Sequence, residues 1–160
     1  MKHIIRELNK EEFNLLPYFL YEAIFQRGEN ERLPIYVVLE PELNIYHDNF
    51  GQEGDFCLVA QIGTELVGAV WARLLSGEPK GFGYVDDKTP ELAISLYQGY
   101  RNKGIGTNLL ELMLSLLKEN GYNQVSLSVH KDNYAVKMYE KFGFKVVKDL
   151  ANLYLMALSL

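Results

Sequence analysis

Apolar and polar residues recur along this chain of 160 residues with two different spacings, and these spacings predict its secondary structure. Short runs that alternate or stay apolar predict strands at residues 3–8, 56–62, 65–75, 91–97, 124–129, 145–148 and 153–158. Helical spacing and capping residues predict helices after Asn9, from Pro17 onward, and at residues 35–39, 41–47, 104–120 and 134–142. Loops are predicted at residues 27–32 and 76–83.

Two connections predict the topology of the sheet. The turn formed by Gly63 and Thr64 is short, so its flanking strands are expected to form an antiparallel hairpin. The helix at 104–120 joins two strands as a crossover, so those two strands are expected to be parallel. The chain is therefore expected to form one domain, residues 1–160, of the α/β class, with a mixed sheet that has antiparallel strands at both ends.

One stretch within this pattern indicates a ligand site. Residues 92–110, LAISLYQGYRNKGIGTNLL, are an apolar strand, a turn broken by glycine, and an amphipathic helix that begins at once. The first N–H groups of a helix have no partner within it, and the helix dipole adds positive potential there. Glycine lets a ligand approach the backbone closely. The stretch therefore predicts an anion site, most naturally for phosphate or pyrophosphate.

The turn itself has the pattern R-x-x-G-x-G, from Arg101 to Gly106. It differs from the dinucleotide-binding pattern G-x-G-x-x-G, and it lacks the lysine and hydroxyl residue of a Walker A loop. Arg101 and Lys103 would add positive charge to the site. The alternative is a glycine turn that only tightens the joint between a strand and a helix.

Composition and charge limit the classes of binding partner that are expected. The net charge of −5 disfavours nucleic acid, and the acidic residues gather at the front: residues 1–60 carry −6 and residues 61–160 carry +1. Such an asymmetry suits a cationic substrate that meets an anionic co-substrate, although a solvated acidic surface is an equal alternative. No stretch reaches membrane-spanning length and no signal peptide is evident, so no membrane partner is expected.

The residue types that bind metals or form disulfides are sparse. Cys57 is the only cysteine and lies in an apolar strand pattern, so a buried, inert thiol and a reducing, cytoplasmic location are expected. His3, His47 and His130 are far apart in the sequence. No metal site is expected from this spacing.

Two motifs together resemble the GNAT superfamily of acyl-CoA-dependent N-acyltransferases. The first is YRNKGIGTNLL, residues 100–110, which is similar to the pyrophosphate-binding signature of that family. The second is NYAVKMYEKFGF, residues 133–144, which resembles its later N-x-x-A-x-x-x-Y-x-x-x-G-F motif. One helix and one strand separate the two motifs. The resemblance implies a GNAT-like fold whose central sheet splays between its fourth and fifth strands.

The resemblance also implies how acetyl-CoA would lie as the co-substrate. Backbone N–H groups would hold its pyrophosphate, and these belong to Arg101, Asn102, Lys103, Gly104, Ile105, Gly106 and Thr107. The strand near Ser95 and Leu96 would splay from its neighbour around Ser128, and the pantetheine arm would bond to the exposed backbone. Asn133 would bond the pantetheine or nearby backbone, and a helix cap is a second role that it can play at the same time.

Two residues are candidates for proton transfer. Tyr139 matches the family's general acid, a phenol that would protonate the leaving thiolate; its alternative is packing among the other apolar residues of its helix. Glu91 starts the strand before the turn, and on that strand it shares a face with Ala93, Ser95 and Tyr97. It is the candidate base, or else a solvated strand end. Glu22, Glu42 and Tyr46 are candidates for the wall of the acceptor pocket.

The function expected from this resemblance is transfer of an acetyl group from acetyl-CoA to a primary amine of a small molecule or peptide, by direct attack. A non-catalytic acyl-CoA sensor or regulatory module is the alternative, and a nucleotide-binding protein of another class is a third. The terminal strands around Tyr154 offer a surface for a homodimer. The acceptor and the acyl chain length are left open.

Overall fold

The structure is a computed structural model that describes residues 2–26 and 32–160. It has one seven-stranded sheet in the order β1-β2-β3-β4-β5-β7-β6. The strands are β1 (Ile4–Glu7), β2 (Phe56–Ile62), β3 (Glu65–Arg73), β4 (Glu91–Leu96), β5 (Gln124–His130), β6 (Lys145–Asp149) and β7 (Leu153–Ser159). The helices are η1 (Lys10–Leu15), α1 (Leu16–Ala23), η3 (Ile35–Leu39), α2 (Pro41–Asn44), η4 (Gln98–Tyr100), α3 (Ile105–Glu119) and α4 (Ala135–Phe142). Residues 27–31 of the predicted loop at 27–32 lie outside the described residues.

The sheet is mixed and open at its centre. Strands β1 to β4 are antiparallel to one another, as are β5, β7 and β6. The two halves meet where β4 runs parallel to β5, and their register contains one pair, Glu91 with Ser126. Beyond Glu91 the strands diverge, so the edge of β4 that faces β5 has no strand partner from Leu92 to Leu96. The predicted mixed sheet and its splay between the fourth and fifth strands are confirmed.

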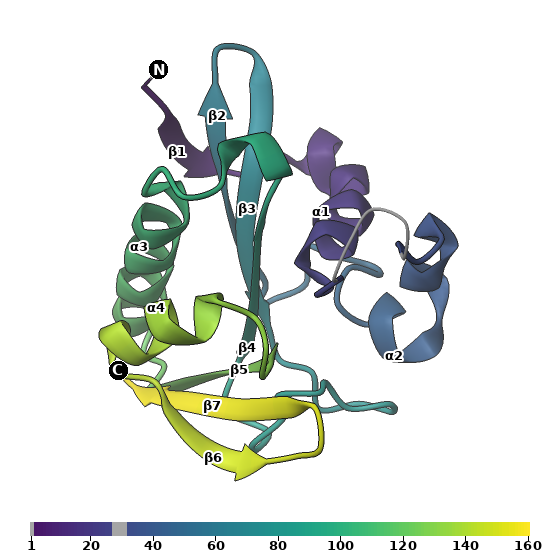
Figure 1. Cartoon of the computed structure of the whole chain (residues 1–160), viewed down its shortest axis with the longest axis vertical. Coiled ribbons are helices and arrows are strands. Elements are labelled where there is room, and N and C mark those ends of the chain that lie inside the picture. The colour runs from purple at the N-terminus through teal and green to yellow at the C-terminus, as the bar shows by residue number, and fades with distance from the viewer. Residues whose placement is uncertain (1, 27–31) are drawn as a thin grey trace.

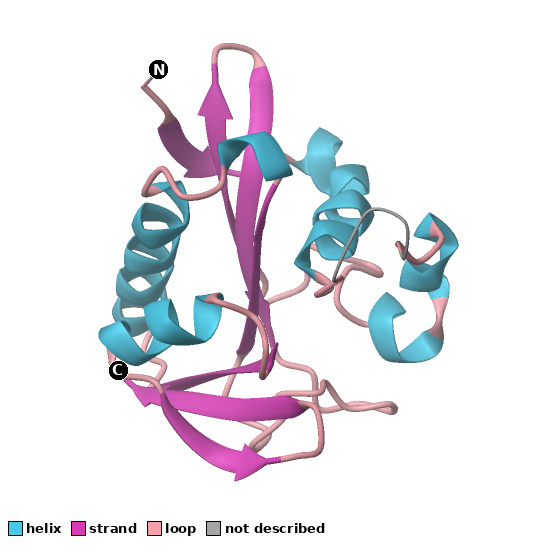
Figure 2. Ribbon diagram, viewed as in Figure 1, coloured by secondary structure: helices cyan, strands magenta, loops and turns pink. Residues whose placement is uncertain are grey.

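Helices cover both faces of this sheet. Figures 1 and 2 show α3 and α4 on one face and α1 and α2 on the other. Side chains alternate between the two layers along β4: Leu92 belongs to the core under α3 and α4, while Ala93 packs toward the core under α1. Trp71 of β3 is fully buried in the second core. The sheet thus separates two cores, and its splay opens between them.

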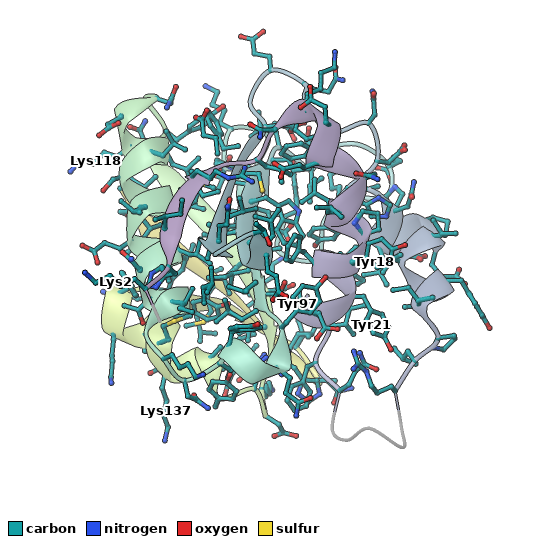
Figure 3. The ribbon with its side chains drawn as sticks, turned by 90° about the horizontal axis from the view of Figure 1, so that it is seen from above. Lys2, Tyr18, Tyr21, Tyr97, Lys118 and Lys137 are labelled. Atoms are coloured by element: carbon teal, nitrogen blue, oxygen red, sulfur yellow. The ribbon has the colours of Figure 1, made fainter. Side chains whose placement is uncertain are left out.

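Helix boundaries follow the local signals in the sequence. Glu12 accepts a hydrogen bond from the Asn9 N–H at 2.8 Å, which is the predicted capping box. Pro17 lies in the first turn of α1, where its missing N–H has no consequence. On α3, Leu116 is half-buried rather than fully buried as the apolar stripe predicts, while Lys118 projects outward (Figure 3).

A few boundaries differ from the pattern. Strand β3 ends at Arg73, two residues before the predicted end, because the chain turns there into the loop at 74–90. The short η4 is not predicted by periodicity, since a single turn carries too few residues to show a period.

Cys57 is buried, as predicted, and burial raises the pKa of its thiol. Among the described residues, no helix is both long and apolar enough to cross a membrane.

Candidate active site

The turn before α3 is a cradle of free backbone amides. Asn102 and Gly104 have positive φ angles of 61° and 83°, which reverse the chain so that α3 begins at Ile105. Within the described part of the chain, no hydrogen bond occupies the N–H groups from Asn102 to Thr107. The Arg101 N–H donates to the Gln98 carbonyl at 3.4 Å. The free amides at the start of a helix dipole suit a diphosphate, which is the group that the sequence motif predicts.

The two glycines of the turn have different physical reasons. Gly104 needs its left-handed conformation, which is strained for residues with a side chain. Gly106 has no positive φ angle, and a Cβ there would meet only Leu96 Cδ1, at an ordinary 3.5 Å. Packing therefore does not require glycine at 106. Its missing side chain leaves the first turn of α3 open toward the cleft that Gly106 lines.

The side chains of the turn point in several directions. The Arg101 guanidinium donates to the Leu96 carbonyl at 3.0 Å and lies 3.6 Å from the Glu22 carboxylate, so it also fastens β4 to α1. Lys103 is exposed, and Ile105 is buried in the core. The Thr107 hydroxyl faces the sulfur of Met138 at 3.8 Å, which brings the start of α3 beside α4.

One cleft of about 1190 Å³ runs from this turn through the splay of the sheet. It brings together most of the predicted site residues: Glu91, Ser95, Leu96, Arg101, Asn102, Gly104, Gly106, Thr107, Asn133 and Tyr139. Lys103 and Ile105 do not line it, so their part in the cradle is limited to backbone N–H groups. Lys137 and Lys141 of α4 do line it, and the sequence analysis missed them. Their spacing of four residues on an amphipathic helix is the signal that marks one shared face.

Ser95 and Asn133 are held by the protein at opposite walls of the cleft. The Ser95 hydroxyl donates to the Phe19 carbonyl of α1 at 2.7 Å, so the β4 backbone rather than this side chain is left for a ligand. The Asn133 side-chain oxygen accepts the N–H of Ala135, the first residue of α4, at 2.9 Å, although the cap position itself is Tyr134, one residue later than predicted. The side-chain amide of Asn133 remains as a donor at the cleft wall.

Tyr139 lies where α4 meets the core. Its ring is buried and packs edge-on against Phe144, with ring centres 5.8 Å apart. Among the described residues, no hydrogen bond engages its hydroxyl, and burial, followed by the nearby Tyr134, raises its pKa. A phenol that is neutral, unbonded and at the edge of a cleft is able to donate its proton to a leaving group.

Glu91 is the buried carboxylate of the cleft. It is only 3% exposed, and one of its oxygens, Oε2, accepts a hydrogen bond from the Tyr46 hydroxyl. The other oxygen, Oε1, has no hydrogen-bond partner among the described residues. Burial raises the pKa of Glu91 to about 7, against the lowering effects of Tyr46 and of the Gly83 backbone. Such a carboxylate is half-protonated near neutral pH, which is the range of a general base.

Tyr46 is the partner of Glu91 that the sequence analysis placed only as a pocket wall. Two side chains of β3 hold its segment: Trp71 Nε1 donates to the Tyr46 carbonyl at 2.9 Å, and the Arg73 guanidinium donates to the carbonyls of Ile45 and Asp48. These residues are more than 20 positions apart in the sequence, and no periodicity links them. The sequence therefore had no signal for this contact.

Arg73 stands beside Glu91 but is directed away from it. The two residues are cross-strand partners on β3 and β4. The Arg73 guanidinium forms two bonds to the Asp55 carboxylate, at 3.1 and 3.0 Å. Because this cation is paired elsewhere, burial dominates the pKa of Glu91.

Glu22 and Glu42, the other two candidates for the wall of the acceptor pocket, lie in different places. Glu22 lines the cleft, but its carboxylate is paired with Arg32 at 2.8 Å and with Arg101. Glu42 is exposed and does not line the cleft. Among the residues that the structure describes, Glu91 is therefore the one carboxylate that lines the cleft without a paired cation.

Two curated relatives show which proteins this chain is similar to. The chain is 30% identical over 154 residues to human N-alpha-acetyltransferase 30, an alignment that covers 94% of this chain and 41% of that protein. It is 36% identical over 101 residues to the N-alpha-acetyltransferase of Saccharolobus solfataricus, with 60% of each chain covered. The chain thus spans less than two thirds of either relative.

A solved structure and a family model complete the comparison. The PaiA N-acetyltransferase of Thermoplasma acidophilum, in complex with coenzyme A, superposes with a TM-score of 0.73 over 100% of both chains at 23% identity, so it has the same fold. The acetyltransferase (GNAT) family model matches residues 8–144, which is most of the chain. The resemblance read from the two motifs is confirmed: this chain belongs to the GNAT family of acetyltransferases, enzymes that use acetyl-CoA.

Proposed function

We propose that this chain transfers an acetyl group from acetyl-CoA to a primary amine by direct attack, and that its preferred acceptor is the α-amine of a peptide. One observation carries the proposal. A single cleft joins the free amides of the α3 turn, the unbonded hydroxyl of Tyr139 and the buried carboxylate of Glu91. The first element suits a diphosphate, and the other two suit an acid and a base.

In the proposed reaction, Glu91 acts as the base and Tyr139 acts as the acid. Acetyl-CoA supplies a thioester, whose C–S bond breaks as the C–N bond to the acceptor forms. Glu91 accepts one proton from the acceptor ammonium, which frees the nitrogen lone pair for attack. Tyr139 donates its proton to the departing sulfur, and the second proton lost by the nitrogen restores the phenol. Glu91 then returns its proton to solvent, so charges and atoms balance.

The pKa of Glu91 favours an α-amine over other primary amines. An α-amino group has an ordinary pKa of about 7.7–8.0, whereas the lysine amine has a pKa of about 10.4. A base with a pKa of about 7 takes a proton from the first group at little cost and from the second at a much larger one. The N-alpha-acetyltransferase names of the relatives point in the same direction.

The test is a panel of amines with acetyl-CoA in which the release of free thiol is measured. Peptides with a free α-amine and no lysine are compared with N-terminally blocked peptides that contain lysine, and with short polyamines. We expect the highest kcat/KM for the free α-amines. Faster turnover of the blocked lysine peptides or the polyamines would overturn the acceptor class, and binding of acetyl-CoA with no amine-dependent thiol release would favour the sensor.

A further inference from the structure

The hydroxyl of Tyr46 is a junction between three separate segments. It lies at the start of the turn after α2, donates to Glu91 Oε2 on β4, and accepts the Phe82 N–H of the 74–90 loop at 2.9 Å. The N–H can only donate, so the hydroxyl proton is directed to the carboxylate. All three residues line the cleft.

The geometry points to Tyr46 as a positioning residue for the reaction: it holds Glu91 Oε2, leaves Oε1 as the carboxyl oxygen that takes the proton, and fastens the 81–83 segment against it. This inference rests on the proposed function of Glu91 as the base. Tyr46 itself is not required to touch either substrate.

Two glycines of the 74–90 loop lie very close to the Glu91 carboxyl group. A Cβ at Gly81 would lie 2.0 Å from Glu91 Oε1, and one at Gly83 would lie 3.0 Å from the carboxyl carbon. Neither glycine has a positive φ angle, so close approach and not backbone conformation explains them. The carboxyl group is therefore confined between the Tyr46 hydroxyl and two glycines.

Titratable side chains on the two strands that flank β4 have other partners among the described residues. On β3, Arg73 is bound to Asp55. On β5, His130 stacks on Phe25 with ring centres 4.5 Å apart. Tyr46 is the titratable side chain that acts on the pKa of Glu91, and its bond lowers that pKa. Removal of the Tyr46 hydroxyl is therefore expected to make Glu91 harder to deprotonate.

The main experiment is Tyr46→Phe, compared with Tyr97→Phe. Tyr97 follows the last residue of β4, at the end of that strand opposite to Glu91, and its ring packs against Phe19 of α1 (Figure 3). For Tyr46→Phe we expect kcat to fall about tenfold, the acidic limb of the kcat/KM profile to move to higher pH, and the acetyl-CoA Kd to stay unchanged. Tyr97→Phe is expected to leave all three quantities unchanged.

A second pair of variants approaches the carboxylate from the loop. Gly81→Ala places a methyl group against Glu91 Oε1, whereas Gly77→Ala in the same loop meets nothing within 4 Å. We expect the first to lower kcat and displace the acidic limb, and the second to behave as wild type. An unmoved limb in both Tyr46→Phe and Gly81→Ala would reduce Tyr46 to packing and overturn the inference.

A measurement without substrate separates the two proposals. The Glu91 carboxyl carbon, assigned in ¹³C-glutamate spectra by its absence in Glu91→Gln, is titrated in wild type and in Tyr46→Phe. We expect a higher midpoint in Tyr46→Phe even if no amine in the panel turns over. Equal midpoints overturn the positioning role, whereas a shifted midpoint with no turnover overturns the proposed function alone.

Discussion

The two ends of the cleft are built in opposite ways. At the α3 turn, the proposed binding groups are contiguous backbone amides, from Asn102 to Thr107, which have no hydrogen-bond partner among the described residues. At the other end, the groups that we propose to act are side chains: Glu91 from β4 as the base, and Tyr46 from the turn after α2 as the residue that positions it. The first end depends on one local conformation, and the second depends on the packing of several distant segments.

This difference predicts how each end responds to change. A site made of backbone N–H groups keeps its donors in most variants that preserve the local conformation, because each donor belongs to the main chain. A site made of buried side chains loses a proton-transfer group with a single atom exchange. Variants at the Glu91 end should therefore alter kcat and pH dependence, and variants at the turn should alter acetyl-CoA affinity.

The largest effect is expected from Glu91→Gln. The amide keeps the volume of the side chain and can still accept the Tyr46 bond, but it cannot accept a proton. We expect kcat with the best amine of the panel to fall by about 10²–10⁴, with an unchanged acetyl-CoA Kd by calorimetry. Glu119→Gln, exposed at the end of α3, is the matched control. A kcat within threefold of wild type would remove Glu91 from the proposed mechanism.

The stability of Glu91→Gln should depend on pH differently from that of wild type. Burial raises the pKa of Glu91 from 4.5 to about 7, so between these values the folded state keeps a proton that the unfolded state loses. The free energy of unfolding of wild type therefore falls as pH rises through this interval, by up to about 3 kcal/mol. The variant lacks this loss. Urea unfolding at pH 5 to 8 measures the divergence, and parallel curves would contradict the buried, ionisable state of Glu91.

The contrast between the ends also explains what the sequence could predict. Strand β4, the turn and helix α3 follow one another directly in the chain, and each carries a local signal. The strand has an apolar run, the turn has a glycine in the left-handed conformation, and the helix has an amphipathic period. The elements, the hairpin, the parallel crossover and the amide cradle were accordingly predicted within a few residues. The hydrogen bond from the first residue of α4 to the Asn133 side chain follows from the same kind of local signal.

The Glu91 end of the cleft has no such local signal. Tyr46 and Glu91 are 45 positions apart, and the bond between them exists because Trp71 and Arg73 fasten the 45–48 segment to β3. Sequence periodicity placed Glu91 on the correct face of β4, but burial and the free Oε1 follow from tertiary packing. Lys137 and Lys141 were missed because an exposed lysine on an amphipathic helix is ordinary until a cleft is seen beside it.

Tyr139→Phe tests the residue that we propose as the general acid. The hydroxyl makes no hydrogen bond within the described structure, so its loss should cost little stability. We expect kcat to fall by about ten- to a hundredfold, with the acetyl-CoA Kd unchanged. Tyr122→Phe, packed against Phe56 away from the cleft, is the control. An unchanged kcat would leave Tyr139 as a packing residue.

The smallest effects, and the sharpest contrast, are expected from alanine at the two glycines of the turn. Gly104→Ala forces a side chain into the left-handed region, at a cost of about 1–2 kcal/mol, so its melting temperature should fall. Gly106→Ala adds a methyl group to the first turn of α3 without a clash, so its stability should hold or rise slightly. The same methyl group narrows the approach to the free amides, so the acetyl-CoA Kd should rise, by roughly tenfold. Thermal melts and calorimetry on both variants should therefore separate stability from affinity, whereas a Gly106→Ala variant with wild-type affinity would mean that the diphosphate does not approach the backbone at this turn.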